Sequence, residues 1–363
     1  RDGALGAVGA VGWMVRSGPY ESLPLRECQI CEPWLLRLNP RLRDAMAWAV
    51  LTFVCSLYYL IPAAYTCTLV LLFTGRPVAG TAALATLIAL SVVPMREWPE
   101  VRRAAQMFYP VLRVRHNMSE ERVAQLMVDW HEHGERYILG MHPHGVVPIQ
   151  AFVWTAFCDQ YLRNDEWGTL YGFGGMATVV TRLPFLRTLL GWLSGIAATY
   201  SNLKRGLLAG KNLYMLPGGL AEIFTAAPGT HIAVWRSRTG LVRLALETGA
   251  RLTPVYVFGG NDLFFQLLTS NSQIARVSRW CGASVTFFWG RWWWCPFVPL
   301  TLPQGMTLVL AEPLPSRRAA ASDGKPTAHE INALKLEYEA ALTILFDAYK
   351  TDAGYPDGKL VVL

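Results

Sequence analysis

The 363-residue sequence contains few charged side chains. Asp, Glu, Lys and Arg make up 16% of it, whereas hydrophobic residues make up 52% and include 14 tryptophans. This balance is unusually apolar for a protein that contacts only water, and it indicates contact with a membrane. The net charge of +7 fits an anionic membrane surface or an anionic substrate. Nucleic acid is not a predicted partner, because the positive residues form no Lys- and Arg-rich block and no recognised binding motif.

Several common functional signatures are missing. The seven cysteines form no disulfide framework, and Cys28 and Cys31 make a single C-x-x-C pair, so no zinc site is indicated. We therefore expect the soluble part to face a reducing compartment. The sequence has no Gly-x-Ser-x-Gly elbow, no phosphate-binding P-loop and no dinucleotide fingerprint, which disfavours serine hydrolases and nucleotide-dependent enzymes. The chain begins at Arg1 rather than Met, so the presence of a targeting segment upstream is left undecided.

Two long uncharged runs lie near the N-terminus. Residues 45–74 carry no charge over thirty positions, and residues 77–95 add nineteen more. About 20 apolar residues span a bilayer, so the two runs predict a membrane hairpin, with a pair of buried core helices as the alternative. Arginines flank both outer ends, which places both ends of the hairpin in the cytosol. Pro62 is expected to kink or divide the first run.

These runs divide the chain into three parts. Residues 1–42 show no sustained period and are interpreted as a flexible N-terminal leader. Residues 43–96 form the predicted transmembrane hairpin. Residues 97–363 form the main domain.

The main domain alternates between strand and helix patterns. Helices are predicted after Ser119, in the mostly apolar segment that follows Gly145, and over 241–247, where Gly249 closes the helix. A further helix is predicted to begin at the capping box Thr327-x-x-Glu330. This alternation predicts an α/β domain in which helices cover a sheet. The predicted strands are residues 137–141, 213–216, 252–258 and 306–311.

The strand 137–141 runs directly into His142-Pro143-His144-Gly145. Pro143 has a fixed φ, Gly145 permits a close turn, and histidine is the side chain best suited to move a proton near neutral pH. We interpret the segment as a general-base site. The alternatives are a turn that happens to carry histidine, or a metal pair, although two ligands are too few for zinc.

Two further strand ends carry glycine and polar residues, and carboxyl ends of strands line the functional edge of an α/β sheet. Pro217-Gly218-Gly219 leads to Glu222, which either orients a histidine or is an ordinary first-turn helix acid. The N–H groups of Gly218 and Gly219 either receive an oxyanion or only form a turn. The other strand end is Gly259-Gly260-Asn261-Asp262.

Two more features have more than one interpretation. Arg236, Arg238 and Arg243 suit a substrate that bears phosphate, or they lie on a solvated face. The segment Trp289–Cys295, which reads Trp-Gly-Arg-Trp-Trp-Trp-Cys, is typical of an interfacial aromatic belt or of a wall around an acyl chain, with core packing as the alternative.

Taken together, the ordered motifs resemble the type-2 diacylglycerol acyltransferase family, which includes monoacylglycerol and wax-alcohol acyltransferases. The resemblance runs from the predicted hairpin to the C-terminus. The sequence departs from the family at Gly260, where Glu is usual, and at Met141, where an aromatic residue is common. The matching blocks are Met141-His142-Pro143-His144-Gly145, Pro217-Gly218-Gly219-x-x-Glu222, Arg238-x-Gly240-Leu241-Val242-x-Leu244-Ala245-Leu246, Pro254-Val255-Tyr256-x-Phe258-Gly259-x-Asn261-Asp262 and the closing helix 338–349.

The resemblance implies a glycerolipid-acyltransferase-like sheet and a membrane enzyme that moves a fatty acyl group from acyl-CoA to diacylglycerol, giving triacylglycerol. It implies the endoplasmic reticulum membrane and the lipid droplet surface, a cytosolic catalytic domain, and no metal or cofactor, since acyl-CoA is a substrate. An oligomer is left open. The implied roles are His144 as general base, His142 as its neighbour, and Glu222 as the residue that orients the imidazole. The N–H groups of Gly145, Gly218 and Gly219 are the oxyanion donors. The implied substrate-binding residues are Pro143, Pro217, Arg238, Gly240, Arg243, Asn261 and Asp262.

Other acceptors remain alternatives. Monoacylglycerol and long-chain alcohols fit the same family, and a non-catalytic membrane lipid-binding protein is a further possibility. Acyltransferases that use lysophosphatidate carry an Asp five residues after the histidine, whereas Val147 and Ile149 occupy those positions here. Leu220 and Ala221 stand where those enzymes have a hydroxyl and a guanidinium that hold the phosphate.

Overall fold

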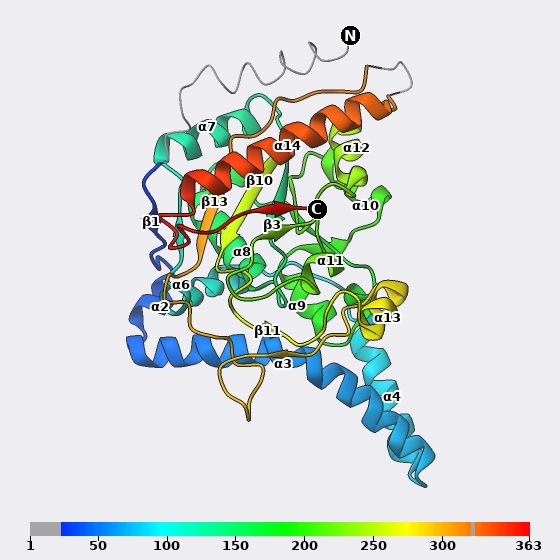
Figure 1. Cartoon of the computed structure of the whole chain (residues 1–363). Helices are drawn as coiled ribbons and strands as arrows, with labels where there is room; N and C mark the ends of the chain where they lie inside the picture. The colour runs from blue at the N-terminus through cyan, green and yellow to red at the C-terminus, as the bar shows by residue number, and fades with distance from the viewer. Residues whose placement is uncertain (1–22, 321–323) are drawn as a thin grey trace.

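An eight-stranded mixed sheet forms the centre of the protein, and helices cover both of its faces (Figure 1). The computed structural model describes residues 23–320 and 324–363. From β10 to β7 neighbouring strands are parallel, while β13 runs antiparallel to β10. This confirms the predicted α/β architecture. In spatial order the strands are β1 (Arg26–Glu27), β2 (Arg115–His116), β13 (Thr307–Leu310), β10 (Arg251–Phe258), β3 (Tyr137–His142), β8 (Leu213–Met215), β6 (Phe173–Met176) and β7 (Gly195–Ala197).

The central strands bury both of their faces. Alternate side chains of β3 enter two separate hydrophobic cores, with Leu139 and Met141 on one side and Ile138 on the other. Strands covered on both faces carry near-continuous apolar residues, which is why the sequence shows 137–141 and 252–258 so clearly. The strand β6, in contrast, contains two glycines and lacks β-branched residues, so its sequence gave no strand signal.

The helices divide between the two faces of the sheet. On one face α10 (Tyr200–Leu208), α12 (Thr239–Thr248) and α14 (Ala328–Tyr349) pack together, and α14 crosses the sheet over β10. The predicted capping box opens α14, and its core face includes the fully buried Tyr338, Leu342 and Phe346. The other face carries α5 (Pro99–Ala104), η1 (Ala105–Met107), α6 (Phe108–Leu112), α8 (Ile149–Tyr161) and the first half of α3 (Pro40–Phe73).

The remaining elements are short. The helices are α2 (Pro33–Arg37), α7 (Glu120–His131), η2 (Val180–Arg182), α9 (Leu186–Trp192), α11 (Leu220–Ile223) and α13 (Gln273–Cys281). The small two-stranded sheets pair β4 (Arg163–Asn164) with β5 (Gly168–Thr169), β9 (Ile232–Ala233) with β14 (Val361–Val362), and β11 (Phe265–Gln266) with β12 (Phe288–Trp289).

The two uncharged runs form α3 and α4 (Pro77–Val92), which pack against each other. A Cβ at Gly80 would lie 2.7 Å from the backbone nitrogen of Leu72, so this glycine permits the close approach of the two helices. The first half of α3 packs on the domain through Ala47, Leu51 and Cys55, whereas its second half and α4 project away from the domain (Figure 1). Pro62 does not divide α3.

Only α3 is long and apolar enough to cross a membrane among the helices that the structure describes. The helix α4 is apolar but has 16 residues, which correspond to about 24 Å at 1.5 Å per residue. The first half of α3 thus packs on the domain as a core helix does, whereas the second half of α3 and α4 are largely exposed, and the membrane hairpin stays a prediction.

Part of the predicted leader belongs to the folded unit. Residues 1–22 lie outside the described part of the chain, but β1 pairs antiparallel with β2 at the edge of the sheet. Leu35 of α2 is fully buried, and the backbone N–H of Leu23 donates to the hydroxyl of Tyr349. The sequence gave no sign of this, because a two-residue strand and a five-residue helix are too short to produce a periodic pattern.

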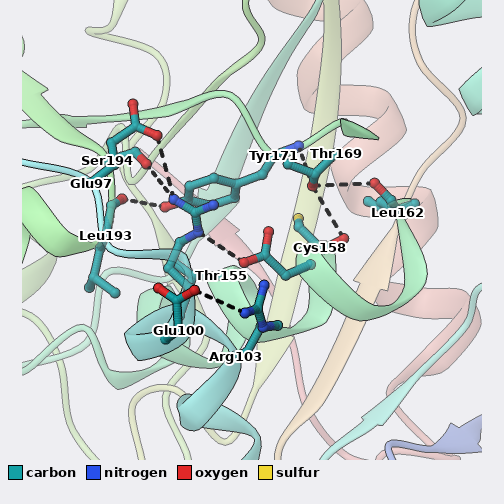
Figure 2. A network of polar contacts seen from close by, with 12 residues as sticks. Glu97, Glu100, Arg103, Thr155, Cys158, Leu162, Thr169, Tyr171, Leu193 and Ser194 are labelled. Atoms are coloured by element: carbon teal, nitrogen blue, oxygen red, sulfur yellow. Dashed lines mark hydrogen bonds and ion pairs between the residues drawn. The ribbon is translucent and has the colours of Figure 1, made fainter. Parts of the chain in front are cut away.

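A buried ion-pair network joins the segment after the hairpin to the domain (Figure 2). Arg102 of α5 donates from Nε to Asp159 of α8 at 3.0 Å and from Nη1 to Ser194 at 2.8 Å. Its guanidinium also lies over the ring of Tyr171, 4.9 Å from the centroid, and 3.6 Å from Glu97. The side chains of Arg102 and Asp159 are 6% and 2% exposed, so this pair is shielded from solvent.

Candidate active site

The central strand β3 ends at His142, which lies opposite Tyr256 of β10 in the sheet. All six residues of β3 are buried, and the turn that follows leads through Gly145 into α8. The neighbouring parallel strand β8 ends shortly before α11, which carries Glu222. Because the carboxyl ends of parallel strands meet at one edge of a sheet, His142, His144 and Glu222 come together there.

Glu222 contacts both histidines. Its Oε1 lies 2.8 Å from Nδ1 of His142 and accepts the backbone N–H of Val234 at 2.8 Å. Its Oε2 accepts the backbone N–H of His144 at 2.6 Å. The residue is 1% exposed, so three N–H groups compensate a carboxylate that is withdrawn from water. Glu222 does lie in the first turn of a helix, but its side chain is directed at the histidines rather than at solvent.

This geometry corrects one sequence-based assignment. The sequence interpretation has Glu222 orient the imidazole of His144, but the carboxylate contacts the ring of His142 and holds His144 through its backbone. The cause is local: His142 ends β3 and faces the adjacent β8 turn, whereas the ring of His144 turns back toward its own chain.

His142 is enclosed. It is 0% exposed, with the rings of Trp235 and Tyr338 at 6.3 and 6.1 Å from its centroid. Those two rings stack at 3.8 Å, and the Tyr338 hydroxyl donates to the carbonyl of Gly140 in β3. Nδ1 of His142 is directed at Glu222, while Nε2 is a buried nitrogen without a hydrogen-bond partner among the described residues.

His144 is half-buried, and its Nδ1 lies 2.9 Å from the carbonyl oxygen of Gly145. A carbonyl can only accept, so Nδ1 carries the proton and Nε2 carries the lone pair. Burial lowers the pKa of His144, while the Gly145 carbonyl and the charge of Glu222 act in the opposite direction. His144 is therefore neutral near pH 7 and able to accept a proton at Nε2.

Gln150 is a site residue that the sequence interpretation missed. This buried residue in the first turn of α8 donates from Nε2 to the carbonyls of Pro143 and His144, at 2.7 and 2.8 Å. These two hydrogen bonds fix the main chain of the histidine turn to α8. No sequence signal marks it, because a glutamine in a helix is ordinary and only the fold brings its amide to these carbonyls.

Two glycines near Glu222 and the histidines are required by space. A Cβ at Gly218 would lie 1.9 Å from the carboxyl carbon of Glu222. A Cβ at Gly145, whose φ is +67°, would lie 2.5 Å from the carbonyl oxygen of Gly260. Gly260, the residue at which the sequence departs from the family motif, thus packs its backbone against the histidine turn.

A family model described as diacylglycerol acyltransferase matches residues 102–363. The chain belongs to this diacylglycerol acyltransferase family. The matched region contains both histidines and Glu222 and begins at Arg102, after the hairpin helices.

Similar proteins include members of this acyltransferase family from mammals. The chain is 30% identical over 245 residues to diacylglycerol O-acyltransferase 2 of Bos taurus, covering 62% of this chain and 64% of that protein. It is 30% identical over 244 residues to 2-acylglycerol O-acyltransferase 3 of Homo sapiens, covering 61% and 66%. The matches therefore span slightly less than two thirds of these relatives' own length. A solved 1-acyl-sn-glycerophosphate acyltransferase from Thermotoga maritima is 14% identical, with a TM-score of 0.37 over 84% of this chain and 96% of that chain.

Asn261 and Asp262, which follow β10, bond to other loops of the domain. Asn261 donates from Nδ2 to the carbonyl of Thr230, and Asp262 accepts the backbone N–H of Gly229 and the hydroxyl of Tyr355. In the structure these two residues hold the loop before β9 and the C-terminal segment.

The arginines predicted to bind the substrate do not share one site: each has a different place and partner. Arg238 donates from Nη2 to the carbonyl of Gly218 at 2.7 Å, so it supports the turn that precedes Glu222. Arg243 is exposed on α12, and Arg236 forms an exposed ion pair with Glu339 of α14. Gly240 lies in the first turn of α12, where a Cβ would meet no atom within 4 Å.

Gly219 and the prolines lie in the turns around Glu222 and the histidines. Gly219 adopts φ +52° at the start of α11, with open space where a side chain would be. Pro217 and Pro143 are buried, one in the turn before Glu222 and one in the histidine turn.

Proposed function

We propose that this protein is a membrane acyltransferase that transfers a fatty acyl group from acyl-CoA to the free hydroxyl of diacylglycerol, giving triacylglycerol. The observation that carries the proposal is the carboxylate of Glu222, which contacts the ring of His142 and the main chain of His144 at the end of the central strand. Membership of the diacylglycerol acyltransferase family supports the choice of reaction.

His144 is the general base in this proposal. Its Nε2 takes the proton of the acceptor hydroxyl as the hydroxyl oxygen attacks the thioester carbonyl carbon. The tetrahedral intermediate then expels the CoA thiolate, and the proton on His144 Nε2 passes to that sulfur. The ring of His144 is partly exposed, whereas that of His142 is fully buried beside Trp235 and Tyr338.

The surrounding groups support that chemistry. Glu222 and Gln150 hold the backbone of His144 from its N–H and its carbonyl. The negative charge of Glu222 also stabilises the imidazolium that forms during proton transfer. The N–H groups of Gly145, Gly218 and Gly219 are the candidate oxyanion donors, since they lie in the two turns on either side of Glu222.

The acceptor in this proposal is uncharged. The charged side chain against the histidines is the carboxylate of Glu222, which repels a phosphate. Arg238, the nearest guanidinium that the motif supplies, already donates to the carbonyl of Gly218. Desolvating a phosphomonoester there without a bidentate partner costs on the order of several kcal/mol.

Diacylglycerol is therefore expected to be acylated while lysophosphatidate is not. The measurement incubates membranes that contain the protein with labelled acyl-CoA and each acceptor in turn, and separates the lipid products. Monoacylglycerol and a long-chain alcohol complete the panel, because one relative is named as a 2-acylglycerol acyltransferase. Faster turnover of lysophosphatidate than of diacylglycerol contradicts the acceptor assignment, and lipid binding without turnover of any acceptor indicates a non-catalytic protein.

The acid limb of the pH profile is a second expected result. Protonation of His144 removes the base, so kcat/KM falls as pH drops through the pKa of this residue. Because burial lowers that pKa, the midpoint is expected below the ordinary histidine value of about 6.5. Activity is thus retained at pH 6.5. An acid-limb midpoint clearly above 6.5, measured with saturating acyl-CoA and limiting acceptor, contradicts His144 as the base.

The location follows from the same proposal. The hairpin of α3 and α4 enters the endoplasmic reticulum membrane and the lipid droplet surface from the cytosolic side, and the catalytic domain stays in the cytosol. The apolar exposed surface of the hairpin tip supports this, with Phe73 and Val78 84% and 85% exposed. A neutral diacylglycerol then reaches the site sideways from the bilayer.

A further inference from the structure

A second apolar surface lies beside α3. Residues 265–298, here called the aromatic arm, comprise β11, α13, β12 and the loop that follows β12. The loop returns through a backbone hydrogen bond from Arg291 to Val298, at 2.8 Å. Together with the paired strands β11 and β12, this bond makes the arm a folded unit rather than an irregular connection.

The aromatic arm is fixed against α3. The hydroxyl of Tyr59 in α3 accepts from the backbone N–H of Phe288 and donates to its carbonyl, at 2.9 and 2.5 Å. The rings of Tyr59 and Phe288 pack edge to face at 5.1 Å. The guanidinium of Arg291 lies over the ring of Trp48, 4.4 Å from its centroid. These contacts tie the direction of the arm to that of the helix that leads into the hairpin.

Large side chains of the arm are exposed. Trp280, Trp293 and Trp294 are 90%, 79% and 63% exposed, which excludes core packing as their role. An aromatic side chain buries about 150–250 Å² when it packs, so three exposed tryptophans leave more apolar area in water than the scattered single residues of an ordinary surface. The other large exposed apolar residues of the arm are Phe265, Leu267, Val277, Val285, Phe287, Trp289 and Trp292.

The charge of this region has one sign. Between Asp262 and Glu312 the sequence contains no Asp or Glu, while Arg276, Arg279 and Arg291 all fall within the arm. A surface that combines exposed tryptophans with arginines and lacks acids suits the anionic interfacial layer of a bilayer, where indole rings and cations are both favourable.

The arm also continues the apolar surface of the hairpin. In Figure 1 the loop after β12 and the hairpin of α3 and α4 project from the same side of the molecule, and α14 lies on the opposite side. Between them the outer face of α3 exposes Val50, Phe53 and Leu60. Exposed apolar residues thus occur in the arm, along α3 and at the hairpin tip.

We propose that the aromatic arm is a second membrane-binding element that inserts its tryptophans into the interfacial layer of an anionic bilayer, beside the hairpin. This inference rests on the membrane location in the proposed function. Two contacts, one from the hairpin and one from the arm, fix the tilt of the domain on the membrane as well as its distance from it.

The test uses the full chain with a fluorescent NBD label on single cysteines. In a background with Cys31, Cys67, Cys281 and Cys295 changed to Ser, the label is placed in separate variants by Trp280→Cys, Trp293→Cys, Val78→Cys at the hairpin tip, and Leu336→Cys on α14. Leu336 is the matched control, because it is 66% exposed but lies in α14, on the opposite side of the sheet from the hairpin. Each labelled protein is reconstituted into liposomes of phosphatidylcholine with phosphatidylserine that carry nitroxide quenchers near the headgroup.

We expect the labels at 280 and 293 to lose most of their fluorescence, while the label at 336 keeps its fluorescence and stays accessible to aqueous iodide. Quenching at 78 without quenching at 280 and 293 overturns the arm as a membrane element and leaves the membrane location standing. If the labels at 78, 280 and 293 all keep their fluorescence, both the orientation and the membrane location are overturned. If the label at 336 is quenched as strongly as those at 280 and 293, the orientation alone is overturned.

The charge is tested separately. Quenching at 280 is expected to be stronger in liposomes with phosphatidylserine than in phosphatidylcholine alone, and Arg276→Gln is expected to reduce that difference. Equal quenching in both lipids overturns the preference for an anionic surface.

Discussion

His144→Ala is expected to lower kcat by about 10²–10⁴-fold, the usual effect of removing a general base. The variant loses the half-buried Nε2 that accepts the hydroxyl proton, but it keeps the backbone N–H that Glu222 binds, so the turn is retained. The measurement is acylation of diacylglycerol by membranes with equal amounts of variant and parent protein. Membrane association should be unchanged, because the hairpin and the aromatic arm are not altered.

Two matched variants decide the interpretation. His133→Ala removes an exposed histidine whose Nδ1 lies 3.1 Å from Asp129, and it should retain full activity. His142→Ala leaves Glu222 without its ring partner, so both stability and activity are expected to fall. If His144→Ala turns over like the parent while folded His142→Ala is inactive, then the base is His142 and the two roles are exchanged.

Arg102→Ala is expected to destabilise the protein by about 3–5 kcal/mol, because it leaves the buried carboxylate of Asp159 without its counter-ion. The substitution also removes the hydrogen bond to Ser194 and the contact with the ring of Tyr171 (Figure 2). The measurement is thermal unfolding in detergent, followed by tryptophan fluorescence. Since α5 joins the hairpin to the domain and Asp159 lies in α8, the loss should also loosen the helix that carries Gln150.

The adjacent arginine is the matched control. Arg103 pairs with Glu100 and Glu32 nearer the surface, where ion pairs contribute about 0–1 kcal/mol, so Arg103→Ala should shift the unfolding midpoint little. Arg102→Met combined with Asp159→Leu should recover part of the stability, because no unpaired charge remains. Equal midpoints for Arg102→Ala and Arg103→Ala refute a structural role for the buried network.

The sequence by itself was sufficient for the elements with strong local signals. The apolar segments at 137–141 and 252–258 became β3 and β10, since strands buried on both faces have few polar residues. The capping box at Thr327 and the glycine after α12 placed two helix ends, because both satisfy backbone groups through neighbouring residues in the chain. The two histidines, Gly218 and Glu222 were identifiable because they follow strands whose carboxyl ends share one edge of the sheet.

The sequence alone could not assign contacts between distant residues. It left open whether Glu222 meets a histidine, and it did not show that the carboxylate takes the ring of His142 and only the backbone of His144. It gave no reason to select Gln150, and it grouped Asn261 with the substrate-binding residues although the loop at Thr230 accepts its amide.

Tertiary structure also decided which apolar segments are interior. Local composition made α3 uniformly hydrophobic, yet its first half packs on the domain and its second half projects from it. The tryptophans after β12 had the composition of either a core or a membrane belt, and the contact of Tyr59 with Phe288 directs them outward. Hydrophobicity and local hydrogen bonding are properties of a short segment, whereas a partner separated by many residues is set only by the packing of the whole chain.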